Sequence, residues 1–314
     1  MRKALVVGIN DYASFPLNGC VNDANKIANV LSRNEDGSPN FAVKLITSPG
    51  NSITRASLRS DIEDLFFGDC DVALFYFSGH GFVKSTGGYI VTSDFKKYDE
   101  GISMDEILKI ANSSKIKDRV ILLDCCFSGS FGTPSITGDF SFLSEGLTIL
   151  TSSRSTETSI EEKGNGVFTT LVVDALNGGS ADLRGNITPG SIYAFVDQAL
   201  GAWDQRPIFK TNVSRFTSLR NVDPPIPTVT LRKICDYFKN PQDEYNLDPS
   251  YEFTEKNAKK GNVEILKDLQ KFESVGLVVP IGEEHMYFAA INSKSCKLTA
   301  LGYQYWKLVK ENKV

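Results

Sequence analysis

Short apolar runs alternate with helical patterns through the first 220 residues of this 314-residue chain. Runs such as Val72–Phe77 are too short for buried helices and are typical of buried strands. Strands that alternate with helices indicate a mainly parallel sheet with helices on both faces. We therefore predict an α/β fold, a three-layer α/β/α sandwich, for residues 1–222. The expected strands are Ala4–Ile9, Ala42–Ile46, Val72–Phe77, Val120–Asp124, Leu147–Thr151 and Pro207–Phe209, and the expected helices are Cys20–Leu31, Ile53–Leu65, Met104–Ala111, Val167–Leu176 and Pro189–Leu200.

Three prolines interrupt this pattern in the segment 223–227, Asp-Pro-Pro-Ile-Pro. Proline cannot continue a helix or a central strand, so we predict a stiff linker here. Residues 228–314 then form a second, small α+β domain. A helix, a β-hairpin and a closing helix in this domain predict a winged-helix-like arrangement. The expected helices are Leu231–Phe238, Val263–Val275 and Thr299–Val309, and the expected strands are Gly276–Ile281 and Met286–Ile291 around a turn at Gly282 and Glu283.

The composition is that of an ordinary globular protein, with 41% hydrophobic and 23% charged residues and a net charge of −4. This charge does not indicate a general nucleic-acid or membrane binder, and no apolar stretch reaches the roughly 18 residues that span a bilayer. The apolar run after Met1-Arg2-Lys3 is shorter than that of a secretory signal and is better explained as a first strand. The six scattered cysteines do not indicate a disulfide framework, so we expect a protein of the reducing cytoplasm.

Two of the expected strands end in residues that carry chemistry. The chain has only two histidines, and His80 lies in Ser-Gly-His-Gly directly after Val72–Phe77. A second apolar run, Val120–Leu123, leads into Asp-Cys-Cys-Phe-Ser-Gly, which contains Cys125 and Cys126. Open parallel sheets present chemistry at the carboxyl ends of their strands. One strand that ends in His and another that ends in Cys predict a thiol nucleophile with an imidazole base.

Four segments, taken in their order and spacing, carry a family resemblance. They are Ala4–Tyr12 with Leu17–Ala24, Phe75–Gly81, Leu123–Gly129, and Gly166–Thr170 with Gln205–Pro207. In these segments the chain resembles the caspase/metacaspase clan of cysteine peptidases, and most of all its metacaspase-type branch. The resemblance covers about two thirds of the chain and stops at the proline-rich segment. It implies a caspase-like sandwich and a cysteine endopeptidase activity.

The resemblance implies a Cys/His dyad in which Cys126 is the nucleophile and His80 is first the base and then the acid. The implied oxyanion donors are the backbone N–H groups of Gly81 and Cys126. A thiol beside a protonated imidazole has its pKa lowered from about 8.5 to roughly 3.5–7.5, which makes thiolate available at neutral pH. We expect Cys125 to pack in the core, because neighbours at a strand end point to opposite faces. We expect His285 at the surface, and no CxxC or paired-His spacing indicates a metal, so no cofactor is expected.

The resemblance also identifies the S1 pocket, which receives the side chain of the P1 residue before the scissile bond. Its implied members are Cys20, Asp23, Ser78 and Asp124. Two carboxylates favour a cationic side chain by electrostatic complementarity, so we predict cleavage after Arg or Lys and not after Asp. Two simpler roles stay open, with Asp23 as a charge at a helix N-terminus and Asp124 as a hydrogen-bonded strand end.

The loop from Ser128 to Ser153 contains no Lys and no Arg. An enzyme specific for basic residues has no cleavage site there, so we predict that the protease works as an uncut single chain. Any self-cleavage is then expected at Arg154, at Lys163 or in the C-terminal region. Metacaspases often need calcium, and although the spacing is not that of an EF-hand, the candidate ligands are Asp94, Asp99 and Glu100.

Residues 228–314 are the candidate regulatory module. They carry 13 Lys and Arg against 12 Asp and Glu, so the electrostatic signature of a DNA binder is weak. We favour recognition of an activating protein or a small signal ligand, with DNA as the alternative. By analogy, the resemblance suggests an effector of antiviral defence or cell death. A function of another class stays open, namely a catalytically idle caspase-like scaffold whose C-terminal domain binds DNA or a partner protein.

Overall fold

The computed structural model describes residues 1–50, 52–84, 87–96, 99, 101–125, 142–152, 161–162, 165–200 and 207–314. The chain forms two compact units, Met1–Val222 and Asp223–Val314. Within the described residues, no helix is both long enough and apolar enough to cross a bilayer.

A six-stranded sheet forms the centre of the first unit. Its order is β12-β8-β7-β3-β1-β2, and all neighbours are parallel except the edge strand β12, which is antiparallel to β8. The predicted, mainly parallel sheet is therefore confirmed. The strands are β1 (Arg2–Gly8), β2 (Ala42–Thr47), β3 (Val72–Ser78), β7 (Asp118–Asp124), β8 (Leu147–Thr151) and β12 (Ile208–Asn212).

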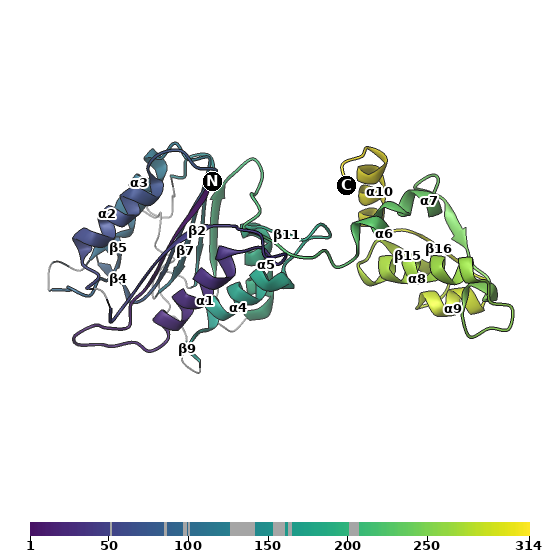
Figure 1. The fold of residues 1–314 in the computed structure, drawn as a ribbon, viewed down its shortest axis with the longest axis horizontal. Coiled ribbons are helices and arrows are strands. Elements are labelled where there is room, and N and C mark those ends of the chain that lie inside the picture. The colour runs from purple at the N-terminus through teal and green to yellow at the C-terminus, as the bar shows by residue number, and fades with distance from the viewer. Residues whose placement is uncertain are drawn as a thin grey trace. The chain divides into compact units, whose positions relative to one another are not determined.

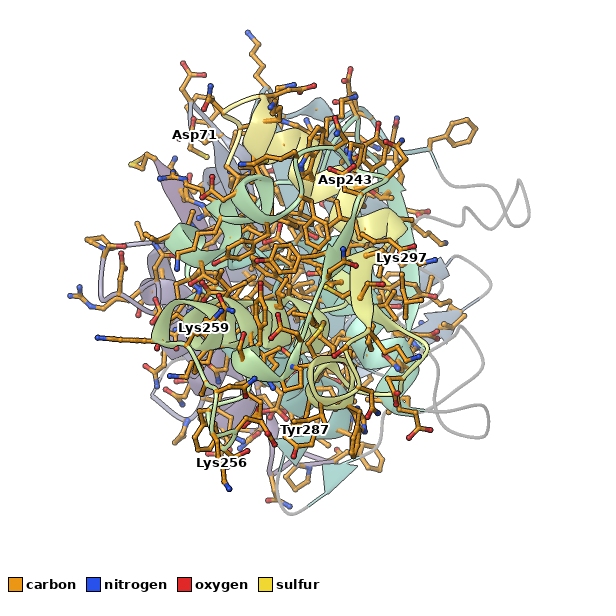
Figure 2. All side chains as sticks on the ribbon, turned by 90° about the vertical axis from the view of Figure 1, so that its right-hand side faces the viewer. Asp71, Asp243, Lys256, Lys259, Tyr287 and Lys297 are labelled. Carbon is orange, nitrogen blue, oxygen red and sulfur yellow. The ribbon has the colours of Figure 1, made fainter. Side chains whose placement is uncertain are left out.

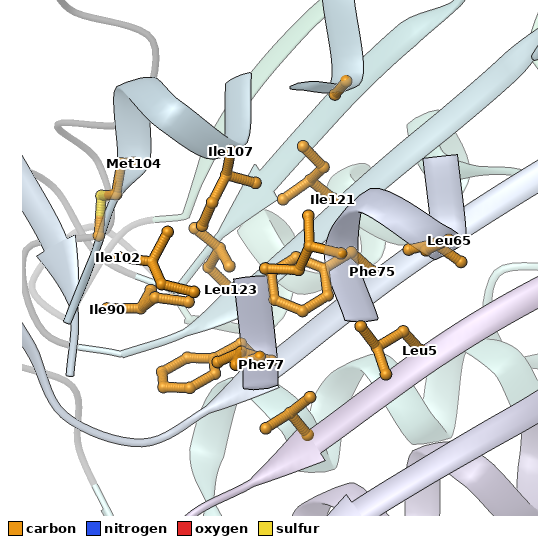
Figure 3. Packing of buried hydrophobic residues seen from close by; sticks show 14 of the residues in the cluster. Leu5, Leu65, Phe75, Phe77, Ile90, Ile102, Met104, Ile107, Ile121 and Leu123 are labelled. Carbon is orange, nitrogen blue, oxygen red and sulfur yellow. The ribbon is translucent and has the colours of Figure 1, made fainter. Parts of the chain in front are cut away.

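Helices cover both faces of this sheet, which confirms the predicted three layers (Figure 1). One face carries α1 (Cys20–Ser32), α4 (Val167–Asp174), which continues into a π-helical turn at Ala175–Gly179, and α5 (Pro189–Leu200); the other carries α2 (Arg55–Phe66) and α3 (Met104–Ser113). Side chains alternate along each strand, so Phe75 and Phe77 join the core under α2 and α3, while Leu74 and Tyr76 join the core under α1 and α4. Figure 3 shows the first of these cores.

Short strands that the sequence analysis did not predict surround the carboxyl end of the sheet. A three-stranded antiparallel sheet follows β3 directly, so it begins one residue after His80. Its strands are β4 (Gly81–Lys84), β5 (Gly87–Ile90) and β6 (Ile102–Ser103), and two further pairs are β9 (Glu161–Glu162) with β10 (Asn165–Gly166) and β11 (Asn186–Ile187) with β13 (Arg220–Asn221).

The second unit packs helices around a three-stranded antiparallel sheet of order β14-β16-β15. The buried side chains of its long helix α8, Leu266, Leu269 and Phe272, follow helical spacing and lie in the core of this unit. The elements are α6 (Thr228–Arg232), α7 (Ile234–Tyr237), β14 (Glu244–Asn246), a 3₁₀ turn at Pro249–Tyr251, α8 (Lys260–Ser274), β15 (Val278–Ile281), α9 (Met286–Ile291), β16 (Ser295–Leu298) and α10 (Ala300–Lys310).

The predicted hairpin in this unit is wrong in its second strand. Met286–Ile291 is the helix α9, and the strand that pairs with β15 is Ser295–Leu298. The physical reason lies in the spacing of the buried residues, because Met286, Ala289 and Ala290 recur at the interval of a helix face and not at alternate positions. The two strands are thus joined by a helix and not by a tight turn at Gly282.

Close packing at Gly8 fixes α1 against the sheet. A Cβ atom on Gly8 would lie 2.7 Å from the Ala24 Cβ and still closer to the Cys20 carbonyl oxygen. No side-chain rotation relieves a clash with backbone. We expect Gly8→Ala to lower the free energy of unfolding by about 1–3 kcal/mol, the usual cost of overpacking, in urea titrations of the full chain followed by circular dichroism. The matched control is Gly50→Ala, because nothing lies within 4 Å of its added methyl group, and equal stability of the two variants would contradict the argument.

Candidate active site

The carboxyl ends of three neighbouring strands bring the predicted site residues to one edge of the sheet. Gly8 of β1 is in register with Ser78 of β3, and Ser78 with Asp124 of β7. The backbone N–H of Gly79 donates to the Asp124 carbonyl at 3.4 Å. The segments that follow the three strands therefore start side by side, as expected for chemistry at the end of a parallel sheet.

His80 is held by a tyrosine from the loop after β1. The His80 backbone N–H donates to the Tyr12 hydroxyl at 3.0 Å, and the two rings pack with centroids 4.6 Å apart. The Tyr12 hydroxyl in turn donates to the Val91 carbonyl at 3.3 Å, while the Val91 N–H donates to the His80 carbonyl at 2.9 Å. Burial raises the pKa of Tyr12 well above its ordinary value, so this phenol stays protonated and keeps both bonds. Gly79 makes the contact possible, because a Cβ there would lie 2.5 Å from the Tyr12 oxygen.

The imidazole of His80 has a defined tautomer when it is neutral. Its Nε2 lies 2.6 Å from the backbone carbonyl oxygen of Phe15. A carbonyl oxygen only accepts, so Nε2 carries the proton and the lone pair is on Nδ1. The Phe15 carbonyl thus orients the ring as a third group, and it would stabilise the positive charge of a protonated ring.

Hydrogen bonds of Asn10 hold the loop that presents Phe15. The Asn10 carbonyl accepts from the N–H groups of Tyr12 and Leu17, at 3.2 and 2.9 Å. Its side-chain oxygen accepts from the Val21 N–H in the first turn of α1, at 3.2 Å. One side chain therefore joins the loop after β1 to the helix that follows it.

Of the two adjacent cysteines, the structure describes Cys125 but not Cys126. Cys125 is 1% exposed and packs in the core under α2 and α3, as predicted for a packing residue. Cys126 lies outside the described residues, as do most of the loop from Ser128 to Ser153 and the residues Arg154 and Lys163. Its role, the oxyanion role of Gly81 and the absence of a maturation cut therefore remain predictions.

The predicted S1 residues gather on the other face of the sheet, beside α1 and α4. Asp23 and Asp124 are both buried, and both approach Gly166 at the start of α4. The Gly166 N–H donates to Asp23 Oδ2 at 2.9 Å, and a Cβ on Gly166 would press against the Asp124 carboxylate. Cys20 is buried in the first turn of α1, and Ser78 is buried at the end of β3.

A chain of hydroxyl groups extends from the Asp124 carboxylate into the core. The Thr169 hydroxyl donates to Asp124 Oδ2 at 2.7 Å, so the Tyr76 hydroxyl, 2.6 Å from the Thr169 oxygen, must be the donor of their shared bond. Burial, together with the negative charges of Asp124 and Asp23, raises the pKa of Tyr76 well above its ordinary value. This phenol remains a donor, and the chain fixes the position of the carboxylate.

The sequence analysis assigned no role to Tyr12, Phe15, Gly166 or Thr169. Tyr12, Gly166 and Thr169 lie inside the segments that carried the family resemblance, which was the only signal available for them. The Phe15 contact involves a backbone carbonyl, so no residue type could have indicated it.

The suggested calcium ligands have other partners. Asp94 Oδ1 accepts from the Arg55 N–H at 3.1 Å and from the Thr92 hydroxyl at 2.7 Å, and Asp99 pairs with the Arg55 guanidinium at 2.9 Å. Glu100 lies outside the described residues. Elsewhere in the described part of the chain, no group of three or more His, Cys, Asp or Glu residues is placed to hold a metal ion. His285, at the start of α9, is exposed.

Comparisons with known proteins agree with the fold of the first unit. A family model described as the caspase domain matches residues 1–217. Solved structures similar to the chain include a protein from Geobacter sulfurreducens, at 15% identity and a TM-score of 0.52, covering 70% of this chain and 99% of that one. They also include Caspase-1 from Spodoptera frugiperda, at 14% identity and a TM-score of 0.51, covering 70% and 90%. At these identities the likeness shows the fold alone. No curated protein matches the chain.

Proposed function

The chain belongs to the caspase domain family, and we propose that it is a cysteine endopeptidase of metacaspase type with Cys126 as nucleophile and His80 as base. The observation that carries the proposal is the His80 ring, whose Nε2 proton is engaged by Phe15 and whose Nδ1 is left as the basic nitrogen. Cys126 follows the buried Cys125 at the end of β7, the strand next to the one that leads to His80. A base and a thiol on neighbouring strand ends are what nucleophilic catalysis needs.

In the proposed reaction, His80 Nδ1 takes the proton of the Cys126 thiol. The thiolate attacks the scissile carbonyl carbon, and the backbone N–H groups of Gly81 and Cys126 donate to the resulting oxyanion. The imidazolium then gives its proton to the leaving amine, and the C–N bond breaks to form a thioester. Water, deprotonated by His80, hydrolyses the thioester and restores the thiol. The Phe15 carbonyl stabilises the charged ring in both halves of the cycle.

Removal of either reacting group tests this proposal. We expect Cys126→Ala and His80→Ala each to lower kcat by at least about 1,000-fold on a peptide with Arg at P1, because the two groups act as a unit. The control is Cys125→Ala, which truncates the neighbouring thiol in the core and should change the rate only a few-fold.

Iodoacetamide should label Cys126 selectively at neutral pH. Hydrolysis that persists in Cys126→Ala would contradict the proposal, and the absence of hydrolysis in the unmodified chain would favour an idle scaffold.

We also propose that the enzyme prefers Arg or Lys at P1. Asp23 and Asp124 place two carboxylates at the end of the sheet, on the same face as Ser78 and Cys20. A guanidinium or ammonium group complements this charge, whereas an acidic P1 side chain is repelled.

Loss of one carboxylate should weaken that preference. We expect Asp124→Asn to lower kcat/KM for an Arg peptide by about 10- to 100-fold, because a hydrogen bond to a charged group contributes roughly 1.5–3 kcal/mol. Asp118→Asn is the matched control, since Asp118 begins the same strand at its opposite end. A panel of fluorogenic peptides with Arg, Lys or Asp at P1 measures both effects, and faster release from the Asp peptide would refute the assignment.

We propose that the second unit regulates the first by recognising a protein or a small ligand, and we retain the winged-helix-like arrangement as a hypothesis. Phe253 and Tyr287 line one pocket on its surface, and the ring centroids of Tyr287 and Phe288 lie 5.1 Å apart. These three aromatic side chains are exposed by 72%, 40% and 46%. Exposed apolar groups of this size are typical of binding surfaces. Lys256 and Lys259 extend from the same unit (Figure 2), but its charge is nearly balanced, which disfavours DNA. Such control would suit a defence or cell-death effector.

Removal of residues 228–314 tests this regulatory role. We expect kcat/KM to change by at least about fivefold, the lower end of ordinary coupling between sites. Circular dichroism of the truncated chain is the control that its sheet remains folded. An unchanged rate in a folded truncated chain would exclude regulation by the second unit.

A further inference from the structure

An apolar pocket lies beside His80. It has a volume of about 310 Å³, and His80 itself forms part of its wall. The described residues that line it include no Asp, Glu, Lys or Arg. Its large apolar side chains come from the loop after β1, from β4 and from the segment after β5, and they are Tyr12, Phe15, Phe82, Val91 and Phe95.

The pocket and the acidic pair lie on opposite faces of the sheet. Tyr12 and Val91 belong to the core under α2 and α3, and Phe82 packs against that core. Asp124 follows Leu122 at the alternate position of β7, so its side chain points to the face of α1 and α4. Asp23, in α1, lies on that same face. His80 stands at the sheet edge that separates the two.

The chemistry of peptide hydrolysis indicates which part of a peptide would lie on each face. In peptide hydrolysis, the imidazolium protonates the leaving amine. The residue after the scissile bond, which carries that amine, therefore lies on the side of the imidazole. If the P1 side chain enters the acidic face, the next residue of the peptide crosses the sheet edge toward the other face. On that face, a pocket is lined by His80 itself.

We propose that this pocket is the S1′ subsite, and that it selects a large apolar or aromatic side chain at P1′, the residue directly after the scissile bond. The proposal rests on the proposed peptidase function, which it deepens. Two rings make up an open apolar rim, because Phe15 is 72% exposed and Phe95 is 48% exposed. A volume at the lower end of the roughly 300–1,000 Å³ usual for ligand pockets suits a side chain better than a cofactor. A Phe or Leu side chain in it would cover both rings, whereas a charged side chain would lose hydration with no Asp, Glu, Lys or Arg in the lining to pair with.

The test compares two internally quenched peptides that share Arg at P1 and carry either Phe or Gly at P1′. With the full, unmodified chain we expect kcat/KM for the Phe peptide to exceed that for the Gly peptide by about tenfold, a discrimination typical of an apolar pocket. The double variant Phe15→Ala, Phe95→Ala should bring this ratio close to one. Both rings are largely exposed, so their truncation spares the core, and the Phe15 carbonyl that orients His80 is retained.

The matched control is Phe67→Ala, since Phe67 is 79% exposed directly after α2 and does not line the pocket. It should leave the ratio of the two constants unchanged. A ratio near one in the unmodified chain, with cleavage that depends on Cys126, would overturn the subsite and leave the peptidase intact.

If neither the full chain nor the chain without residues 228–314 cleaves either peptide, the peptidase proposal is overturned. Binding of the peptides then tests the pocket separately. Fluorescence anisotropy of the same peptides, labelled, on the full-length Cys126→Ala chain provides this measurement. Tighter binding of the Phe peptide that is lost on truncation of Phe15 and Phe95 supports the pocket assignment, and equal binding of the two peptides overturns it.

Discussion

The hydrogen bond from the His80 backbone to the Tyr12 hydroxyl joins the loop after β1 to the end of β3. Without it, the Phe15 carbonyl and the His80 ring would be presented by two independent loops. Tyr12 is buried between them, and its hydroxyl donates a hydrogen bond to the Val91 carbonyl. This bond extends the connection to the segment after β5. A single buried phenol therefore aligns three segments, and the tautomer of the imidazole follows from that alignment.

The sheet separates two chemical environments by the direction of its side chains. Alternate residues of β3 and β7 point to opposite faces, so the acidic pair and the apolar pocket lie on opposite faces of one sheet. On the acidic face, the Gly166 N–H and the hydroxyl of Thr169 stabilise the carboxylates. On the other face, aromatic rings exclude charge. In a peptide that crosses this edge, the acidic face would select the side chain before the scissile bond, and the apolar pocket would select the side chain after it.

The second unit shows where pattern reasoning reached its limit. Met286–Ile291 is apolar and short, which fits either a strand or a helix, and the glycine at 282 favoured a hairpin. The strand that pairs with β15 is Ser295–Leu298, with Lys297 exposed and Cys296 buried. Such a strand has little apolar signal, since its buried residues are Ser295, Cys296 and Leu298, of which only Leu298 is large and apolar.

The sequence alone determined the α/β class, the layers, most of the first unit's elements and the edge of the sheet at which His80, Ser78 and Asp124 meet. The elements follow from local periodicity. The shared edge follows because the carboxyl ends of neighbouring parallel strands lie at the same edge of a sheet. Only the tertiary structure decided which groups touch there. The Phe15 carbonyl against Nε2, the Tyr12 phenol under the ring and the hydroxyl chain behind Asp124 depend on contacts between residues far apart in the chain, and one of them involves a backbone atom that every residue has. Side-chain patterns report burial and chemistry, whereas a hydrogen bond between distant segments exists only once folding has brought its donor and acceptor within about 3 Å of each other.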